Sequence, residues 1–282
     1  MQRAPLIDHP SLAMPALGFG TFELDGATVR RMVPQVLEMG YRHIDTAQAY
    51  DNEQDVGAAV EGSGIARGEV FITTKVWVDR FEPDELRASV RESLDRLRTD
   101  YTDLLLLHWP RFDRAGGAGM GPTLEALLRE REDGRCRHIG VSNFTIAHLE
   151  QAAGIVGDGE IATNQVEYHV YLGQVRLREA MRRTGLALTA YMPLAKGRAI
   201  DEPVLAEIGR AHGKSAAQVA LKWLVTQPAV AAIPATSSED HARANLDLFD
   251  FELASDEIAR IDSLERGERI CTPESLQPDW DD

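Results

Sequence analysis

The chain has 282 residues, and its 44% hydrophobic and 27% charged residues give the composition of a globular protein with enough apolar material for a full core. Its formal net charge of −15 argues against nucleic acid as a partner, because phosphate binding requires clustered Lys and Arg. No apolar run reaches the length of a membrane span, and the prolines and the acidic residue in 1–18 do not fit a signal peptide, so no membrane association is predicted.

Apolar stretches typical of β-strands alternate with amphipathic helical stretches along the chain. Before them, the segment 6–18 predicts a small β-hairpin. The expected strands lie at 17–22, 41–47, 70–76, 103–109, 138–143, 162–168, 187–194 and 231–236. The expected helices between them include 26–40, 84–98, 123–134, 145–157, 173–185 and 215–227, several of which end at a Gly.

This alternation predicts one closed barrel. Strands that are apolar on both faces and separated by helices indicate a parallel sheet. Eight such units, with no linker or break in composition, favour a single (β/α)8 TIM-barrel domain over 1–282 rather than an open doubly wound sheet. Two helical stretches, 202–213 and 255–267, do not fit the alternation and are predicted as additions to the barrel. The segment 111–122 is predicted as a loop on the barrel rim.

Polar residues stand where the expected strands end. In a barrel of this kind the active site lies at the C-terminal ends of the strands. Taken singly, each residue has an ordinary alternative, since Asp45 could cap a helix, Lys75 could be a solvated charge and His108 could be a buried structural histidine. Their joint occurrence on one rim predicts a site. The residues are Asp45, Lys75, His108, Asn143, Gln165, Tyr191 and Thr236, with Tyr50 in the loop after the second strand.

Four of these residues have the chemistry needed to protonate a carbonyl oxygen. A free phenol has a pKa of about 10, so Tyr50 is a poor acid near neutral pH unless a neighbouring cation lowers that pKa. Lys75 could supply the cation, and Asp45 would keep the ammonium charged in a dry site. His108 would orient the carbonyl or share the proton.

Seven motifs occur in order at barrel spacing, and together they resemble the aldo-keto reductase family over nearly the whole chain. The motifs are GFGTF at 18–22, GYRHIDTAQAYDNE at 40–53, ITTKVW at 72–77, LLHWP at 106–110, GVSNF at 140–144, NQVEYH at 164–169 and IPATS at 233–237. GFGTF lacks the third glycine of the Rossmann fingerprint, so its glycines more plausibly let the backbone approach cofactor and substrate closely. The ending CTPESLQPDWDD is most similar to bacterial reductases of the 2,5-diketo-D-gluconate and methylglyoxal type.

The resemblance implies a catalytic tetrad of Asp45, Tyr50, Lys75 and His108. It implies NAD(P)H-dependent reduction of aldehydes and ketones, such as small dicarbonyls and keto-sugar acids, to alcohols. The hydride would come from the nicotinamide, and Tyr50 would donate the proton.

The implied cofactor, NADP(H) or NAD(H), would lie extended across the barrel mouth. Amide side chains at strand ends suit a carboxamide, which needs both a donor and an acceptor. Asn143 and Gln165, with Ser142, would hold the carboxamide, and Tyr191 would stack on the nicotinamide ring. The residues implied for cofactor binding are Gly20, Thr21, Phe22, Asp45, Ser142, Asn143, Gln165, Tyr191, Pro193, Leu194, Gly197, Ile233, Ala235, Thr236, Ser237, His241 and Asn245.

Two positions depart from the family pattern at the adenosine end of this site. Relatives that prefer NADPH usually carry a Lys and an Arg that clamp the 2′-phosphate, and Ala235 and His241 occupy those places here. The loss of two cations weakens the case for strict NADPH use, because a phosphate monoester carries nearly two negative charges. The hydroxyls of 236–238 can still donate hydrogen bonds, and Arg243 could turn toward the phosphate. We therefore predict NADP(H) binding with relaxed preference and use of NAD(H).

Aromatic side chains are expected to line the substrate pocket, namely Phe22, Trp77, Trp109 and Phe112. Core packing is an equal alternative for all of them except Trp109. The resemblance favours a small or polar carbonyl substrate and a monomer. The only two cysteines lack metal-type spacing, which indicates free thiols and predicts a cytoplasmic location.

Two other functions stay open. A metal-dependent barrel hydrolase could draw on His43, Asp45, His108 and His169, although no His-x-His pair follows the first strand, and no metal is expected. A non-catalytic protein could keep the same fold and hold a nucleotide as a redox sensor. The complete tetrad favours the reductase over both.

Overall fold

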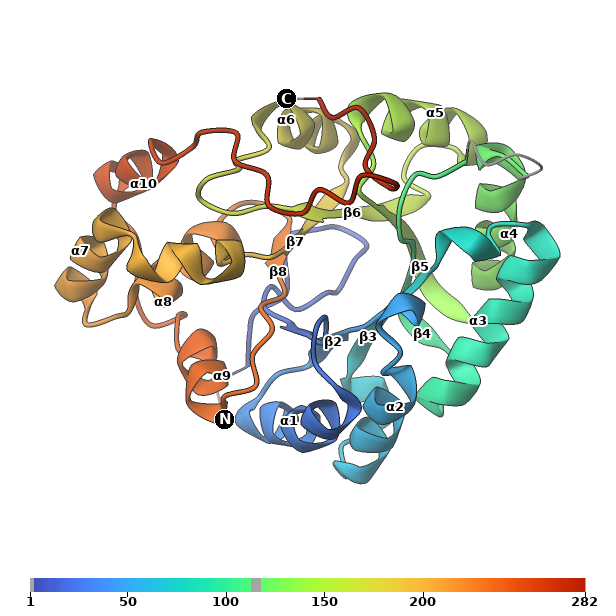
Figure 1. Ribbon diagram of the computed structural model, residues 1–282, viewed down its shortest axis with the longest axis horizontal. Coiled ribbons are helices and arrows are strands. Elements are labelled where there is room, and N and C mark those ends of the chain that lie inside the picture. Colours follow the sequence, from blue (N-terminus) through green and yellow to red (C-terminus); the bar gives the residue numbers. More distant parts are fainter. Residues whose placement is uncertain (1–2, 113–117, 282) are drawn as a thin grey trace.

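The computed structural model describes residues 3–112 and 118–281, and this part of the chain forms a barrel of eight parallel strands (Figure 1). In sheet order the strands are β1 (Phe19–Gly20), β2 (His43–Asp45), β3 (Phe71–Val76), β4 (Thr102–Leu107), β5 (Cys136–Ser142), β6 (Ile161–Glu167), β7 (Ala187–Tyr191) and β8 (Val230–Ala232). A parallel bridge between Leu17 and Ala232 joins the first strand to the last. The predicted (β/α)8 TIM barrel is therefore confirmed.

Helices surround the barrel. They are α1 (Gly26–Met39), α2 (Glu53–Gly62), α3 (Pro83–Leu97), α4 (Met120–Glu132), α5 (Ile146–Val156), α6 (Val175–Thr184), α7 (Pro203–His212), α8 (Ala216–Val225), α9 (Glu239–Leu246) and α10 (Ser255–Asp262). The two predicted additions are α7, which packs against α8, and α10, which packs against α7. None of the helices in 3–112 and 118–281 combines the length and apolar character needed to cross a membrane.

The loop predicted on the rim after β4 is shorter than expected, because α4 begins at Met120 rather than at 123. Part of this loop, 113–117, lies outside the described residues.

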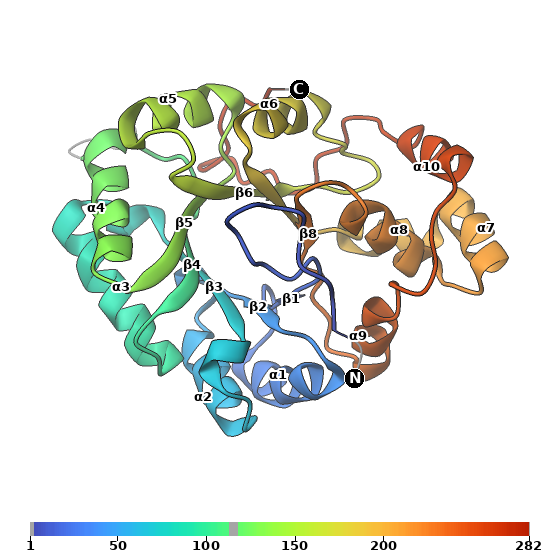
Figure 2. The ribbon, with the colours of Figure 1, turned by 180° about the vertical axis from the view of Figure 1, so that it is seen from behind.

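The N-terminal segment closes one end of the barrel. Of the predicted hairpin, the described residues keep one antiparallel bridge, between Leu6 and Pro15, and no regular strand. Prolines in this segment lack the amide donors that a longer ladder needs. Leu12 and Met14 are buried, and Figure 2 shows the segment lying across the end of the barrel that faces the viewer. The barrel interior is therefore sealed at this end by apolar side chains.

The C-terminal tail lies at the opposite end. After α10 the chain forms no further helix or strand up to residue 281. Figure 1 shows it running across the mouth of the barrel, where the strands end. The candidate site therefore lies between the strand ends and this tail.

Helix α2 packs closely against the end of α3, and a glycine makes this possible. A Cβ on Gly57 would overlap the carbonyl oxygen of Arg96 and lie 2.6 Å from the carbonyl carbon of Leu97. These are backbone atoms, so they cannot turn away as a side chain can. Gly62, at the end of the same helix, has no atom within 4 Å of the place where its Cβ would stand.

Gly57→Ala is expected to lower the free energy of unfolding by about 1–3 kcal/mol, because the added methyl group forces α2 away from α3. Gly62→Ala is the matched control. It should raise the free energy of unfolding by up to about 1 kcal/mol, because alanine reduces the conformational entropy of the unfolded chain. Urea denaturation followed by circular dichroism measures both changes. Equal effects of the two substitutions would contradict the packing argument.

Candidate active site

Three neighbouring strands bring the predicted tetrad together. Asp45 ends β2, Lys75 lies near the end of β3, and His108 follows β4 directly. Tyr50 ends the short 3-10 helix η1 (Gln48–Tyr50), which follows β2. Gln48 fixes this turn, because its side-chain oxygen accepts the amide of Trp77 at 2.9 Å.

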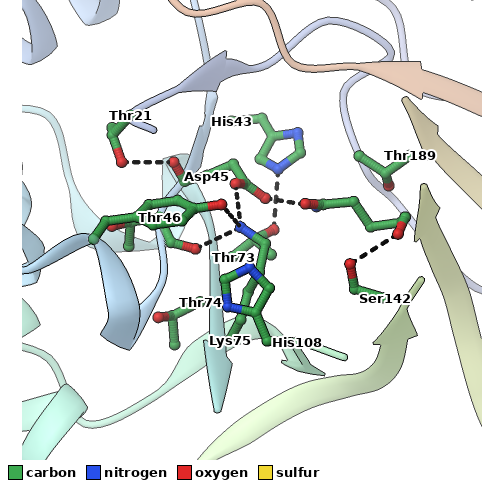
Figure 3. Close-up of polar contacts among 12 residues, drawn as sticks. Thr21, His43, Asp45, Thr46, Thr73, Thr74, Lys75, His108, Ser142 and Thr189 are labelled. Carbon is green, nitrogen blue, oxygen red and sulfur yellow. Dashed lines mark hydrogen bonds and ion pairs between the residues drawn. The ribbon is translucent and has the colours of Figure 1, made fainter. Parts of the chain in front are cut away.

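Lys75 is the centre of the polar network (Figure 3). Its Nζ lies 2.5 Å from Asp45 Oδ1, 2.8 Å from the carbonyl oxygen of Thr46 and 3.1 Å from the hydroxyl of Tyr50. Lys75 is fully buried and Asp45 is 1% exposed. Burial alone would lower the pKa of Lys75, but the Asp45 carboxylate and the Tyr50 hydroxyl outweigh it and raise that pKa. The ammonium therefore stays charged at neutral pH.

The acid–base balance at Tyr50 differs from the sequence-based expectation. Burial raises the pKa of Tyr50, and the Lys75 ammonium only opposes this rise. The prediction that Lys75 lowers the pKa of the phenol below its ordinary value is therefore wrong for the protein by itself. Loss of hydration destabilises the phenolate more than the Lys75 ammonium stabilises it. Tyr50 instead retains its proton at neutral pH.

His108 lies beside Tyr50 and stays neutral. The two ring centroids are 5.6 Å apart, and the Trp77 ring lies 5.2 Å from His108 on another side. Burial and then the Lys75 charge hold the pKa of His108 well below its ordinary value. Its Nδ1 is buried and has no hydrogen-bond partner among the described residues. A neutral imidazole has one nitrogen that donates and one that accepts, so it can orient a polar group of a ligand.

The residues expected to hold a carboxamide are already linked to the tetrad. Gln165 Nε2 donates to Asp45 Oδ2 at 2.7 Å, so one carboxylate serves both Lys75 and Gln165. Asn143 Nδ2 donates to the carbonyl oxygen of His108 at 3.0 Å. The hydroxyl of Tyr191 donates to Asn143 Oδ1 at 2.7 Å. These bonds fix the orientation of both amide side chains.

A cavity of about 880 Å³ borders this network, and both the strand ends and the C-terminal tail line it. Most residues that the sequence placed at the cofactor and substrate sites line it. They are Gly20, Phe22, Asp45, Tyr50, Trp77, His108, Trp109, Ser142, Asn143, Gln165, Tyr191, Pro193, Leu194, Gly197, Ile233, Ala235, Thr236, His241 and Asn245.

Lys75 of the tetrad lies beneath the cavity without lining it, and three residues predicted for cofactor or substrate binding do not line it either. Thr21 is fully buried behind the rim, and its hydroxyl donates to the carbonyl oxygen of Asp45 at 3.0 Å. Ser237 faces α1, where its carbonyl oxygen accepts from Arg31 at 2.9 Å. Phe112 does not form a pocket wall.

Phe112 packs away from the cavity because two other aromatic rings receive it. Its ring stacks on Phe81 with centroids 5.4 Å apart and meets the edge of Phe144 at 5.9 Å. The expectation that Phe112 lines the substrate pocket is therefore corrected to core packing. The sequence alone could not distinguish these two roles.

The glycines of the 18–22 motif serve the barrel wall. A Cβ on Gly18 would lie 2.6 Å from His43 Nδ1, and one on Gly20 would lie 2.7 Å from the carbonyl oxygen of Ile233. Gly20 also lines the cavity. Its missing side chain therefore both lets the backbone at Ile233 come close and leaves space in the cavity.

Sequence reasoning missed the contribution of the C-terminal tail. Cys271, Pro273 and Leu276 line the cavity. The tail has no periodic pattern of apolar residues, and the resemblance of its last residues carries no information on where it lies.

The loops after β1 and β7 are joined across the rim, since Lys196 Nζ lies 3.2 Å from Glu23 Oε1.

The residues considered for a metal-dependent hydrolase do not form one ligand set. His43 Nε2 pairs with Thr73 Oγ1 at 3.0 Å, and His169 Nε2 pairs with Glu167 at 2.9 Å. Within the described ranges no group of three or more His, Cys, Asp or Glu side chains could hold a metal ion.

Comparison with known proteins gives consistent results. The model of a family described as the aldo/keto reductase family matches residues 16–266. Methylglyoxal reductase DkgB of Escherichia coli O157:H7 is 40% identical over 270 residues, which cover 96% of this chain and 100% of that protein. Glyoxal reductase of Bacillus subtilis (strain 168) is 40% identical over 265 residues, or 93% of each chain. A crystal structure assigned as 2,5-diketo-D-gluconic acid reductase B is 48% identical, with a TM-score of 0.94, and covers 100% of this chain and 98% of that one.

His43 generates a prediction for stability. Burial lowers its pKa from 6.5 to about 4, although Asp45 opposes the shift. Between pH 6.5 and 4 the unfolded chain therefore binds a proton that the folded protein does not, so stability falls as the pH is lowered through this window. The loss attributable to His43 is about 3 kcal/mol once the pH is below about 4.

His43→Gln should accordingly show a shallower fall in the free energy of unfolding from pH 6.5 to 4 than the wild type. Urea denaturation at several pH values measures the slope. His241→Gln, which removes an exposed imidazole, is the control and should keep the wild-type slope. An unchanged slope in His43→Gln would refute the assignment.

Proposed function

Since this chain belongs to the aldo/keto reductase family, we propose that it reduces small aldehydes, ketones and dicarbonyls to alcohols, with NAD(P)H as hydride donor and Tyr50 as proton donor. The observation that carries this proposal is the placement of Lys75 Nζ within 2.5 Å of Asp45 and 3.1 Å of the Tyr50 hydroxyl at the floor of the cavity. The relatives named methylglyoxal reductase and glyoxal reductase support a small dicarbonyl as substrate.

Tyr50 can act as an acid because its phenol is protonated at rest and its phenolate would not stand alone. When the carbonyl oxygen gains negative charge, the phenol gives up its proton, and the Lys75 ammonium stabilises the phenolate that remains. Asp45 holds that ammonium in its charged form. His108, which is neutral, can donate an N–H to the same carbonyl oxygen and so fix its position beside Tyr50.

The cavity has the features that a nicotinamide cofactor requires. Its volume of about 880 Å³ lies in the range typical of ligand sites. Ser142, Asn143 and Gln165 offer fixed donors and acceptors for a carboxamide. Tyr191 lies next to them, where its ring can cover one face of the nicotinamide.

The far end of the cavity supports a relaxed choice between NADP(H) and NAD(H). Ala235, Thr236 and His241 line it, and none of these side chains carries a fixed positive charge. Thr236 Oγ1 accepts the amide of Ser238 at 3.1 Å, which leaves its hydroxyl proton free to donate to a phosphate. Arg243 is exposed on α9 and can add one mobile cation.

The free thiols of Cys136 and Cys271 support a reducing, cytoplasmic location. The family resemblance supports a monomeric, single-domain enzyme whose partner is the small carbonyl substrate.

Tyr50→Phe removes the proposed proton and should lower kcat for methylglyoxal by at least about 100-fold. The dissociation constant for NADPH, measured by fluorescence quenching, should change little, because the ring and its packing remain.

The same assays on the wild type separate the alternative functions. A redox sensor would bind NADPH without turnover, and a metal-dependent hydrolase would lose activity with a chelator. Full activity of Tyr50→Phe would eliminate Tyr50 as the acid.

Ala235→Lys restores one cation at the adenosine end. It should raise kcat/KM for NADPH by about tenfold through a charge-assisted bond to the 2′-phosphate, with little change for NADH. The wild type should use both cofactors with similar kcat/KM. Ala235→Met, which has a side chain of similar length without charge, is the control. A thousandfold preference of the wild type for NADPH would refute the relaxed choice.

A further inference from the structure

The part of the C-terminal tail that lines the cavity is held at both ends by contacts with the rest of the protein. Further along, the amide of Ile146 donates to Asp281 Oδ2 at 2.9 Å, and the Trp280 ring lies 6.3 Å from Trp109. At the near end, the amides of Ile270 and Cys271 have no strand to pair with, since no sheet reaches the tail in the described residues. Their partner is a carboxylate.

That carboxylate belongs to Glu167, the last residue of β6, which is fully buried. Its Oε1 accepts the amide of Ile270 at 2.7 Å, and its Oε2 accepts the amide of Cys271 at 2.8 Å. Burial by itself would raise the pKa of Glu167, but the hydrogen bonds from His169, Cys271 and Ile270 outweigh it and lower that pKa. Glu167 is therefore ionised at neutral pH and makes charge-assisted bonds.

His169 fixes the orientation of this carboxylate. Its Nδ1 accepts the amide of Tyr171 at 3.3 Å, which leaves Nε2 as the protonated nitrogen that donates to Glu167 at 2.9 Å. His169 is also fully buried. Glu167 and His169 thus form a rigid pair, called the dyad below. The remaining hydrogen-bond acceptor positions of its carboxylate are directed at the tail. The dyad lies outside the tetrad, and none of its bonds involves Lys75 or Asp45.

The Glu167–His169 dyad lies next to the cavity, beside Tyr191. Glu167 is paired in register with Tyr191 on β7, and Tyr191 and Cys271 both line the cavity. Glu167 therefore holds Cys271 in the wall of the cavity that also contains the ring proposed to cover the nicotinamide. Pro273 and Leu276 follow it along the cavity wall.

We propose that Glu167 is a positioning residue for carbonyl substrates. Its carboxylate fixes the start of the tail, and this fixes the wall that Cys271, Pro273 and Leu276 present to the substrate. The inference rests on the proposed reductase function. Because Glu167 touches neither Tyr50 nor the tetrad's ion pair, it sets substrate affinity and leaves the proton transfer intact.

The experiment compares Glu167→Gln with Glu130→Gln. Glu130 is on α4, away from the cavity, and is equally buried. It binds Arg87 and Arg135, so it controls for the loss of a buried carboxylate. In Glu167→Gln one amide oxygen remains, and the other position becomes a donor that faces the N–H of the tail. KM for methylglyoxal should rise by about tenfold, with kcat within about threefold of the wild type. The dissociation constant for NADPH should stay within about threefold.

A second readout does not depend on turnover. Cys271 is partly exposed and Cys136 is buried, so alkylation by iodoacetamide followed by peptide mass spectrometry reports on the tail, with Cys136 as internal reference. Release of the tail in Glu167→Gln should speed alkylation of Cys271 by about tenfold and leave Cys136 slow. If the wild type proved inactive, the proposed function would fail, whereas this readout would still test the anchor.

Ile270→Pro tests the same bond from the other side, because proline has no amide hydrogen to donate. This substitution lies in the tail and leaves the barrel sequence unchanged. It therefore tests the anchoring of the tail even if Glu167→Gln does not fold. It should raise KM and the alkylation rate in the same way. Unchanged KM and unchanged Cys271 alkylation in a folded variant, or equal changes in Glu130→Gln, would overturn the proposal.

Discussion

The buried ion pair between Lys75 and Asp45 is the interaction on which the rest of the site depends. Burial disfavours the charged form of Lys75 in this position, and the Asp45 carboxylate outweighs that effect. The pair leaves one carboxylate oxygen for Gln165 and one ammonium hydrogen for Tyr50. The side of the cavity proposed to donate a proton and the side proposed to bind the nicotinamide therefore share a single charged centre.

This arrangement gives the phenol two properties that would conflict in water. Burial keeps Tyr50 protonated at rest, and the adjacent ammonium would lower the energy of the phenolate that forms in the proposed reaction. In that reaction the Lys75 ammonium would stabilise the charge that develops in the transition state, which is where an interaction accelerates a reaction. The simpler expectation of an acidified phenol at rest considered the cation and omitted the loss of hydration.

The barrel and its strand-end residues could be predicted from sequence because both follow from local rules. Apolar strands alternate with helices, and parallel strands place their last residues on one rim, so Asp45, Lys75 and His108 had to lie close together. Phe112 and the tail obey no such rule. An aromatic ring just beyond a strand packs wherever a partner is available, and Phe81 lies far from it in the chain. The bond between Glu167 and Cys271 joins residues 104 positions apart, and neither the NQVEYH motif nor the ending CTPESLQPDWDD indicates that the two meet.

The dyad at the end of β6 binds the tail through its main chain alone. Any residue except proline at positions 270 and 271 would supply the same two N–H groups, so the anchor imposes almost no requirement on the side chains that follow. Substitutions at Pro273 or Leu276 can therefore reshape the pocket while the register of the tail and the tetrad below it stay unchanged. Divergence of substrate range among proteins built in this way needs no compensating change in the barrel.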